Sequence, residues 1–576
     1  MKEGLTAALI VRDERANLEE LLPILAGAID DIVIVDTGST DGTIETARAA
    51  GARVIEDAWC DDFSRARNRG LEEVRTSHVL WLDADDRLAR EDLPRIREAA
   101  LARPNTALLL LLINEDPDPH AVSSCFQLRV FPSDPRHRFT GRVHEQILPQ
   151  LTRSGVTTAT LDIAIRHRGY LDPAEVMRKA RRNVQLLRCE IQEDDRNLTA
   201  LYHFVKAASR TGDLEDGARI ARRTVANPPP GSPADVIQAL RVLSAQLTLR
   251  LGRGEEARQL LLEAVDADRG DPLARFFLAQ RLRAEGDLAG AFRLLEEARR
   301  LPIRSGSLPV PVAGIRRAIR LQLGELCELF GRPADAVYLY KEILEADRED
   351  GSAKRACARA LLGALRLDEA GALLNSLTDP PGEDAELVLL RATLAFLQCD
   401  LDQARSLFET AAVLDPRSWA APLHLGHLAL RRGDRPGALI HYSKALACAD
   451  IPETRVGMAA CQLEHGFPQL ALEHLAKAAD QAHGRPLPAG TEALAGEALL
   501  LLGLPQPARD ALEAHLKRFG PEPRIVSRLA DCYREMGEPQ AARVGYEEAL
   551  RLEPSLASAR EGLRALAPAV SSALPS

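Results

Sequence analysis

The segment IVIVDTGSTDGT at residues 32–43 decides the fold of the first part of the chain. Four consecutive β-branched residues predict a buried strand, and the following polar run predicts a turn into a helix from Ser39 or Thr40 to Ala50. Strands are also expected at 5–11, 53–55 and 78–82, and helices at 17–25 and 63–74. Buried strands that alternate with helices predict an α/β domain with a mostly parallel sheet.

Polar residues follow the strands at the carboxyl edge of this sheet, where parallel sheets bind ligands. Residues 12–14 follow the first strand, 36–43 the second and 83–86 the fourth. Acidic groups gathered at one edge raise one another's pKa unless a cation or a donor-rich ligand lies among them. Asp83 and Asp85 offer the hard oxygen ligands that Mg²⁺ or Mn²⁺ takes, and such an ion bridges diphosphate oxygens.

The rest of the chain is repetitive. An alanine that opens a helical pattern after a glycine-containing turn recurs at positions 218, 257, 291, 336, 370, 404, 438, 471, 508 and 542. An aromatic residue often follows four positions later, as at Phe408, Tyr442 and Tyr546, and lies on the same helical face. The period, mostly 34 residues, and these internal positions resemble the tetratricopeptide repeat. Such an array has a concave face that holds peptides or proteins, although an array that packs only on itself or forms a dimer is the alternative.

Composition excludes several classes of protein. The chain has 576 residues and a net charge of −10, which argues against a nucleic-acid-binding surface. No segment approaches the roughly 20 apolar residues of a membrane-spanning helix, and the N-terminus does not resemble a signal peptide. Nine scattered cysteines without a CxxC pair indicate reduced thiols. We therefore expect a cytoplasmic protein without a transmembrane segment.

Several motifs carry a family resemblance. VDTGSTDGT at 35–43, DDFSRARNRGL at 61–71 and LWLDADD at 80–86 resemble, in order and spacing, the family 2 inverting glycosyltransferases of the GT-A fold. FQLRVFP at 126–132, FTGRVHEQI at 139–147 and IRHRGY at 165–170 resemble a bacterial subgroup in which this domain precedes tetratricopeptide repeats. The resemblance implies metal-dependent, inverting transfer from a nucleotide-sugar, with a UDP-sugar as the expected donor. The implied acceptor is a protein, a peptide or a glycan.

The resemblance also implies residue roles. Six residues are expected at the nucleotide-sugar: Val11, Glu14, Asp36, Arg67, Asp83 and Ala84. Asp85 is expected to bind the metal, and His167 is a third metal ligand, a diphosphate contact or a structural histidine. Thr37 departs from the family pattern, because many relatives have a second aspartate there. Asp41 and Thr43 are expected to cap the next helix.

Glu145 is the expected general base that takes the proton of the acceptor. Two alternatives remain open: Glu145 only orients the acceptor, or it pairs with Arg142. His144 could shape the same pocket. A basic segment follows, with Arg178, Lys179, Arg181, Arg182 and Arg188, and we expect it to be solvated or to face phosphate.

The expected organisation has four parts: a GT-A domain over residues 1–170, a helical linker over 171–195, about ten repeats over 196–565 and a disordered tail over 566–576. The repeats are expected to recruit the acceptor or a protein partner. The alternative from another functional class is an interaction scaffold with an inactive transferase domain. A nucleotide-sugar hydrolase and a nucleotidyltransferase are weaker options, the latter because residues 11–15 lack the glycines of its phosphate-binding loop.

Overall fold

The computed structural model describes residues 2–169, 173–303, 308–377, 384–482 and 486–566. Packing divides the chain into two compact units, residues 1–319 and 320–576. The predicted disordered tail lies, apart from its first residue, outside the described residues.

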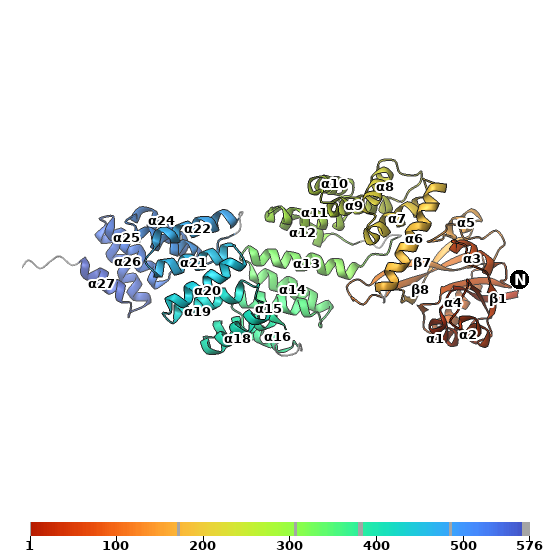
Figure 1. The fold of residues 1–576 in the computed structure, drawn as a ribbon, viewed down its shortest axis with the longest axis horizontal. Helices are drawn as coiled ribbons and strands as arrows, with labels where there is room; N and C mark the ends of the chain where they lie inside the picture. The colour runs from red at the N-terminus through yellow and green to blue at the C-terminus, as the bar shows by residue number, and fades with distance from the viewer. Residues whose placement is uncertain (1, 170–172, 304–307, 378–383, 483–485, 567–576) are drawn as a thin grey trace, which may run out of the picture. The chain divides into compact units, whose positions relative to one another are not determined.

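The first unit contains an eight-stranded sheet with the order β3-β2-β1-β4-β7-β6-β8-β5 (Figure 1). The strands are β1 (Lys2–Val11), β2 (Asp31–Asp36), β3 (Arg53–Glu56), β4 (Thr76–Asp83), β5 (Asp86–Arg87), β6 (Thr106–Asn114), β7 (Ser123–Pro132) and β8 (Thr157–His167). Neighbouring strands among β1–β4 are parallel, as are β6 and β8, whereas β7 runs antiparallel to β4 and β6. The predicted α/β class with a mostly parallel sheet is confirmed.

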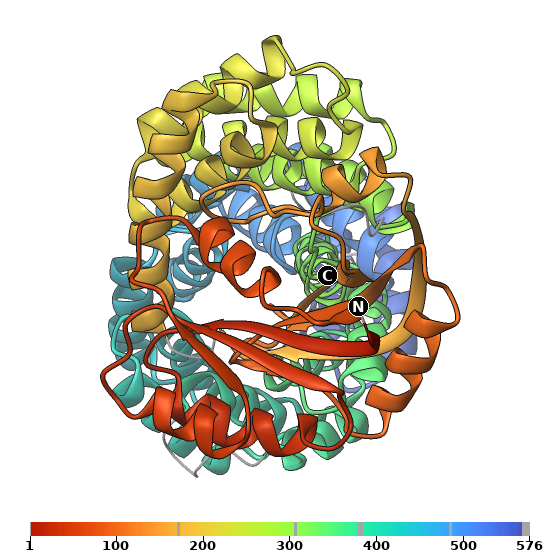
Figure 2. The same cartoon turned by 90° about the vertical axis from the view of Figure 1, so that its right-hand side faces the viewer.

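Helices cover both faces of this sheet (Figure 2). One face packs against α1 (Arg15–Leu25), α2 (Thr43–Ala49) and α4 (Asp92–Leu101). The other face packs against α3 (Phe63–Leu71) and α5 (Leu148–Arg153). The sheet is therefore buried on both sides, which agrees with its continuous apolar strands.

The expected start of the second helix at Ser39 or Thr40 is wrong, because α2 begins at Thr43. Asp36 Oδ1 accepts hydrogen bonds from the Gly38 and Ser39 N–H groups, which holds this segment in a turn. Gly42, with φ +92°, then occupies the left-handed region immediately before the helix. The turn between β2 and α2 is therefore longer than local propensity indicates.

Helices make up the remainder of both units. The first unit continues with α6 (Pro173–Glu193), α7 (Leu198–Thr211), α8 (Leu214–Ala226), α9 (Ala234–Arg250), α10 (Gly254–Ala267), α11 (Pro272–Ala284) and α12 (Leu288–Arg300), and α13 (Val312–Leu329) begins in it. The second unit contains α14 (Pro333–Ala346), α15 (Gly351–Gly363), α16 (Leu367–Asn375), α17 (Ala385–Leu397), α18 (Leu401–Leu414), α19 (Ala420–Arg431), α20 (Arg435–Cys448), α21 (Pro452–Glu464), α22 (Pro468–Ala482), α23 (Thr491–Leu501), α24 (Pro505–Phe519), α25 (Pro523–Glu535), α26 (Pro539–Leu552) and α27 (Ala557–Ala565). None of the helices in the described part of the chain combines the length and apolar character that crossing a bilayer requires.

The ten recurring alanines explain how these helices pair. Each lies in the second helix of a pair, from Ala218 in α8 to Ala542 in α26, and all ten are 0% exposed. A larger side chain there would separate the two helices. At Gly426 of α19, an added Cβ would lie 2.8 Å from the Tyr442 ring of α20. Small residues thus leave the space that the aromatic side chain fills.

Candidate active site

The register of the sheet brings the predicted site residues to one edge. On one side of β1, Val11 is paired with Asp36 of β2. On the other side of β1, Ile10 is paired with Asp83 of β4. Since neighbouring strands lie about 4.8 Å apart, the ends of β2 and β4 are separated by roughly 10 Å. Asp36 and Asp83 therefore lie on opposite sides of the end of β1.

The β1–β2 side of the edge presents an unsatisfied acceptor. Asp36 is 1% exposed, and its Oδ1 holds the turn described above. Its Oδ2 is buried and has no hydrogen-bond partner among the described residues. A buried carboxylate oxygen without a donor is costly, so this position suits a ligand N–H or O–H group.

The backbone around Asp36 is firmly fixed. The Val11 carbonyl accepts hydrogen bonds from both the N–H and the Oγ1 of Thr37, at 2.9 and 3.1 Å. Glu14 is half-buried, and its Oε2 accepts a 2.7 Å hydrogen bond from Asn17. Thr37 therefore joins the two strand ends.

Asp41 and Thr43 connect the starts of the first two helices. Asp41 Oδ1 accepts from the Thr43 N–H and hydroxyl groups, and Asp41 Oδ2 accepts from the Arg15 N–H. The Thr43 hydroxyl oxygen in turn accepts from the Glu14 N–H at 2.9 Å. Both side chains are thus used within the protein, but the N-cap position of α2 is Gly42 and Thr43 lies inside the helix, so the expected capping by Asp41 and Thr43 is wrong.

The end of β4 lies in a network of buried charges. Arg67 on α3 donates to Asp83 Oδ1 at 2.8 Å and to Glu145 Oε1. Its guanidinium carbon lies 4.3 Å from the centre of the Trp81 ring. Against the effect of burial, Arg67 and then Arg129 lower the pKa of Asp83. Asp83 is therefore held as a carboxylate beside two guanidinium groups.

Arg129 is a site residue to which the sequence analysis gave no role. It is 1% exposed, donates to Asp86 Oδ2 at 2.9 Å and stacks on the face of Trp81 at 4.0 Å. The pairing of β6 with β7 shifts register at this point, which leaves Arg129 as the extra residue of a bulge. An arginine within the apolar run FQLRVFP was a signal of this role, but its partners depend on the fold.

Four side chains form a group that fits a divalent cation. The ligand atoms of Asp83, Asp85, Asp86 and His167 all lie within 4.8 Å of one another. Carboxylate oxygens with one imidazole suit Mg²⁺ or Mn²⁺. Burial raises the pKa of Asp85, so an ionised Asp85 calls for a nearby cation. The group includes Asp85 and His167, the two residues predicted to bind a metal ion.

The third predicted role of His167, as a structural residue, also has support. Its Nδ1 lies 3.0 Å from Asp86 Oδ1 and 3.3 Å from Asp85 Oδ1. Burial lowers the pKa of His167, but the hydrogen bond with Asp86 and the neighbouring carboxylates outweigh burial and raise it. Ala84, also in this segment, is buried, and its carbonyl accepts a hydrogen bond from Arg87.

The loop at 139–147 brings Glu145 to this network. The sequence left open that Glu145 pairs with Arg142, and this alternative is wrong. Glu145 binds Arg67 instead, and Arg142 pairs with Glu193 on α6. The arginine that pairs with Glu145 is therefore distant from it in the sequence, whereas Arg142, only three residues away, pairs with another carboxylate.

Helix α6 contributes to the site rather than only joining two parts of the chain. Lys179 Nζ lies 3.7 Å from Asp85 Oδ2. Glu190 is buried, its Oε2 accepts from the Arg142 N–H at 3.1 Å, and its Oε1 accepts from Asn197 at 2.8 Å. Val143 of the loop shares an apolar cluster with α6 and α7. The loop that carries Glu145 is thus anchored by the helices that follow the sheet.

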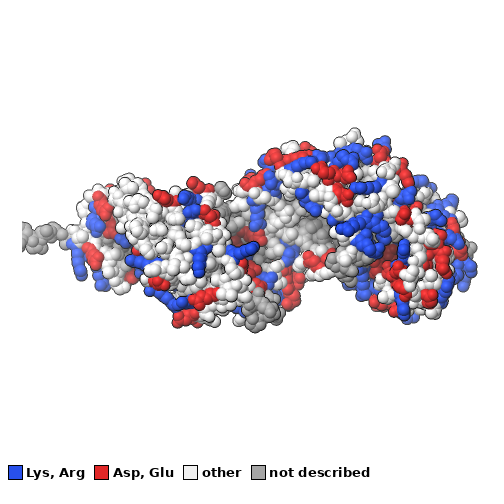
Figure 3. All heavy atoms as spheres, in the orientation of Figure 1, with Lys and Arg blue, Asp and Glu red and all other residues white. Residues whose placement is uncertain are grey.

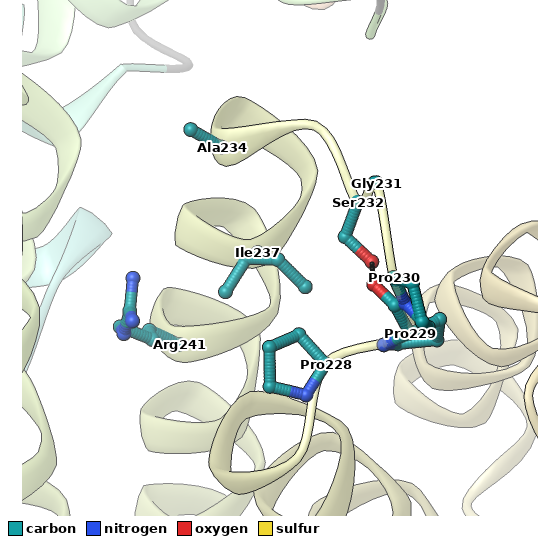
Figure 4. A pocket seen from close by; sticks show the side chains of 8 residues that line it. All are labelled: Pro228, Pro229, Pro230, Gly231, Ser232, Ala234, Ile237 and Arg241. Carbon is teal, nitrogen blue, oxygen red and sulfur yellow. Dashed lines mark hydrogen bonds between the residues drawn. The ribbon is translucent and has the colours of Figure 1, made fainter.

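A cavity of about 430 Å³ lies elsewhere in the first unit, between α8 and α9 (Figure 4). Its lining consists of Pro228, Pro229, Pro230, Gly231, Ser232, Ala234, Ile237 and Arg241. No carboxylate, thiol or imidazole is among these residues, so the lining offers no general base to activate Ser232, whose hydroxyl donates to the Pro229 carbonyl.

Comparison with known families agrees with both parts of the chain. Residues 7–149 match glycosyl transferase family 2. Residues 242–305, 329–394 and 389–450 match tetratricopeptide repeat families.

Individual relatives match only parts of the chain. A TPR repeat-containing protein of Synechococcus elongatus is 33% identical over 28% of this chain and 41% of its own length. The SPbeta prophage-derived glycosyltransferase SunS of Bacillus subtilis is 22% identical over 39% of this chain and 53% of its own length. The chain thus spans roughly half or less of these relatives. One chain in the crystal structure of the APC/C hetero-tetramer Cut9-Hcn1 is 14% identical to this chain. The match covers 68% of this chain and 94% of that one, with a TM-score of 0.33.

Proposed function

Because the chain carries a family 2 glycosyltransferase domain followed by tetratricopeptide repeats, we propose that it transfers a sugar from a nucleotide-sugar to an acceptor with inversion. The expected donor is a UDP-sugar. The observation that carries this proposal is the group of Asp83, Asp85, Asp86 and His167 at the carboxyl edge of the sheet.

The nucleoside of the donor would occupy the β1–β2 side of the edge. Asp36 Oδ2, buried and without a donor, would accept from the N3–H of uracil or from a ribose hydroxyl. Uracil suits this position because cytosine has no N–H at the corresponding ring nitrogen. Val11 and Glu14 border the same side.

Asp85, His167 and Asp83 would hold a divalent cation that neutralises the diphosphate of the donor. Lys179 and Arg67 lie next to these carboxylates and add positive charge where the leaving diphosphate develops negative charge. Asp86, bound to Arg129 and to the Asp83 N–H, positions the end of β4.

Inversion requires a single in-line displacement. Glu145 would remove the proton of the acceptor as the bond from the acceptor to the anomeric carbon forms and the bond from that carbon to the diphosphate breaks. The Arg67 guanidinium holds Glu145 in the buried network, which fixes the carboxylate relative to Asp83. Repeats beyond α7 would recruit the acceptor, a protein, a peptide or a glycan, or a protein partner.

A binding measurement tests the donor site. Asp36→Asn keeps an oxygen for the Gly38 and Ser39 N–H groups but replaces the unpartnered oxygen with an amide donor. We expect calorimetry with UDP and Mn²⁺ to show binding that weakens about 10-fold or more in this variant, because a buried donor would face a donor. Asp402→Asn, on the exposed surface of α18, is the matched control and should bind UDP like the wild type. Equal affinity of wild type and Asp36→Asn would remove Asp36 from the donor site.

A further inference from the structure

The first helix of the repeats takes part in the wall of the proposed site. His203 on α7 stacks on His144, with ring centroids 3.6 Å apart and an interplanar angle of 11°. His144 directly precedes Glu145 and has φ +56°, in the left-handed region that is costly for a residue other than glycine. The helix and the loop thus meet through a strained and specific contact beside the proposed base.

Lys206 lies next to this stacked pair, three residues after His203 on the same face of α7. It is half-buried, and within the described part of the chain no carboxylate pairs with it. Burial lowers the pKa of Lys206, Arg210 lowers it further, and Cys125 has the opposite effect. A partly desolvated cation without a counter-charge is unfavourable unless a ligand supplies the anion.

The two histidines add no positive charge beside Lys206. The dense surroundings lower the pKa of His144 to about 4 and that of His203 well below its ordinary value, although part of the His144 side chain is open to solvent. Both rings are therefore neutral near pH 7. The negative group beside them is Glu145, which Arg67 already binds.

Positive charge extends from Lys206 onto the neighbouring helix. Arg182 on α6 stacks on Phe63 at 4.9 Å and acts electrostatically on His144. In Figure 3, Lys and Arg side chains gather over α6, on a protein whose net charge is −10. The side of the site formed by helices is thus basic, whereas the strand edge opposite it is acidic.

We infer that Lys206, beside the His144–His203 stack, is a subsite for an anionic group of the acceptor, a phosphate or a carboxylate. This inference rests on the proposed transferase function, because it places that group next to the base Glu145. It assigns a substrate-binding role to the first repeat helix and limits the acceptor to molecules that carry negative charge near the reacting group.

Titration with inorganic phosphate and with acetate tests the subsite. The full-length protein is treated with EDTA and dialysed into metal-free buffer without EDTA before calorimetry, so that neither a metal ion nor the carboxylates of EDTA contribute to the measured anion binding. Lys206→Met keeps the length of the side chain and removes the charge, Lys206→Arg keeps the charge, and Lys341→Met on α14 is the matched control. Lys341 is more exposed than Lys206 and pairs with Glu369.

We expect millimolar binding by the wild type, a loss of about 10-fold or more in Lys206→Met, and affinity within about 3-fold of the wild type in Lys206→Arg and Lys341→Met. The anion that binds more tightly identifies the group on the acceptor. Unchanged binding in Lys206→Met, or no binding of either anion by the wild type, would overturn the inference. UDP binding by the wild type is measured separately, so failure of the donor site and failure of this subsite are distinct results.

Discussion

The contact between Glu190 and Asn197 offers a sharp test of how the loop at 139–147 is held. Both Glu190 oxygens accept hydrogen bonds, one from the Asn197 amide and one from the Arg142 N–H. In Glu190→Gln, one oxygen becomes an NH₂ donor that faces another donor. Leaving a buried donor unsatisfied costs about 1–3 kcal/mol, which is the destabilisation we expect.

Asn197→Asp creates the opposite mismatch, in which two acceptors face each other. Its carboxylate can still cap α7 through the Ala200 N–H, but it places a second carboxylate oxygen against Glu190. We expect a similar loss of stability from this single change. In the double variant the introduced glutamine amide donates to the introduced aspartate, so most of both losses should disappear and the coupling energy should approach their sum, about 2–6 kcal/mol.

Tryptophan fluorescence during urea unfolding measures these free energies. The chain has three tryptophans, of which Trp59 and Trp81 lie in the first unit and Trp419 in the second. A Trp419→Phe background therefore restricts the signal to the unit that contains Glu190. Asp350→Asn is the matched control: Asp350 is a buried cap of α15 in the second unit, so this change should leave the transition of the first unit unaltered.

The same variants connect the contact to activity. Because Glu190 anchors the loop that carries Glu145, Glu190→Gln should slow release of nucleoside diphosphate by up to about 10-fold, and the double variant should recover most of the rate. Additive losses of stability in the double variant would refute the reasoning, since Glu190 and Asn197 would then not interact as described.

Four further predictions follow from single contacts. Glu145→Gln should bind nucleotide-sugar normally but transfer it ~10²–10⁴-fold more slowly, as seen in single-turnover assays; unchanged turnover would place the base elsewhere. Asp85→Ala should lose Mn²⁺-dependent UDP binding in calorimetry while keeping its circular dichroism, and unchanged affinity would exclude it as a metal ligand. Burial lowers the pKa of His144 to about 4, so its contribution to the free energy of unfolding is present above pH 6.5 and is lost as the pH falls through the lowered pKa. In His144→Phe, urea titrations should therefore show a free energy of unfolding that depends less on pH than in the wild type. Parallel pH profiles of the two proteins would contradict this. Tyr546→Phe should cost about 0.5–1.5 kcal/mol because the Tyr546 hydroxyl donates to Asp531, whereas Tyr442→Phe should be neutral or stabilising because its buried hydroxyl has no partner among the described residues; equal losses on urea unfolding would show the contacts to be equivalent.

The sequence was sufficient where neighbours along the chain determine the structure. The recurring alanines are recognised from the spacing of the repeats along the sequence. Each of them is buried in the second helix of its pair. Asp36 and Asp83 end their strands, Asp85 lies two residues beyond β4, and parallel pairing alone brings strand ends to one edge. These positions required no knowledge of distant contacts.

Other features depend on contacts between distant segments. Arg129 reaches Asp86 because a bulge directs it there, and Glu190 meets the 141–143 backbone about 50 residues away in the sequence. The repeat pattern places His203 and Lys206 on a helix but does not indicate which other segment that helix contacts. Their position beside His144 was therefore not predictable. The early start assigned to the second helix failed because Asp36 forms hydrogen bonds with the turn in place of helical ones.

The central claim is that the carboxyl edge of this sheet uses a nucleotide-sugar. The most direct measurement is release of nucleoside diphosphate by the full-length protein from a panel of UDP-, GDP- and dTDP-sugars, in Mn²⁺ and in EDTA. We expect release from at least one UDP-sugar in Mn²⁺, a loss of that release in EDTA, and slower release by Glu145→Gln. Absence of release from every donor in Mn²⁺, together with absence of UDP binding, would contradict the account and favour a scaffold with an inactive transferase domain.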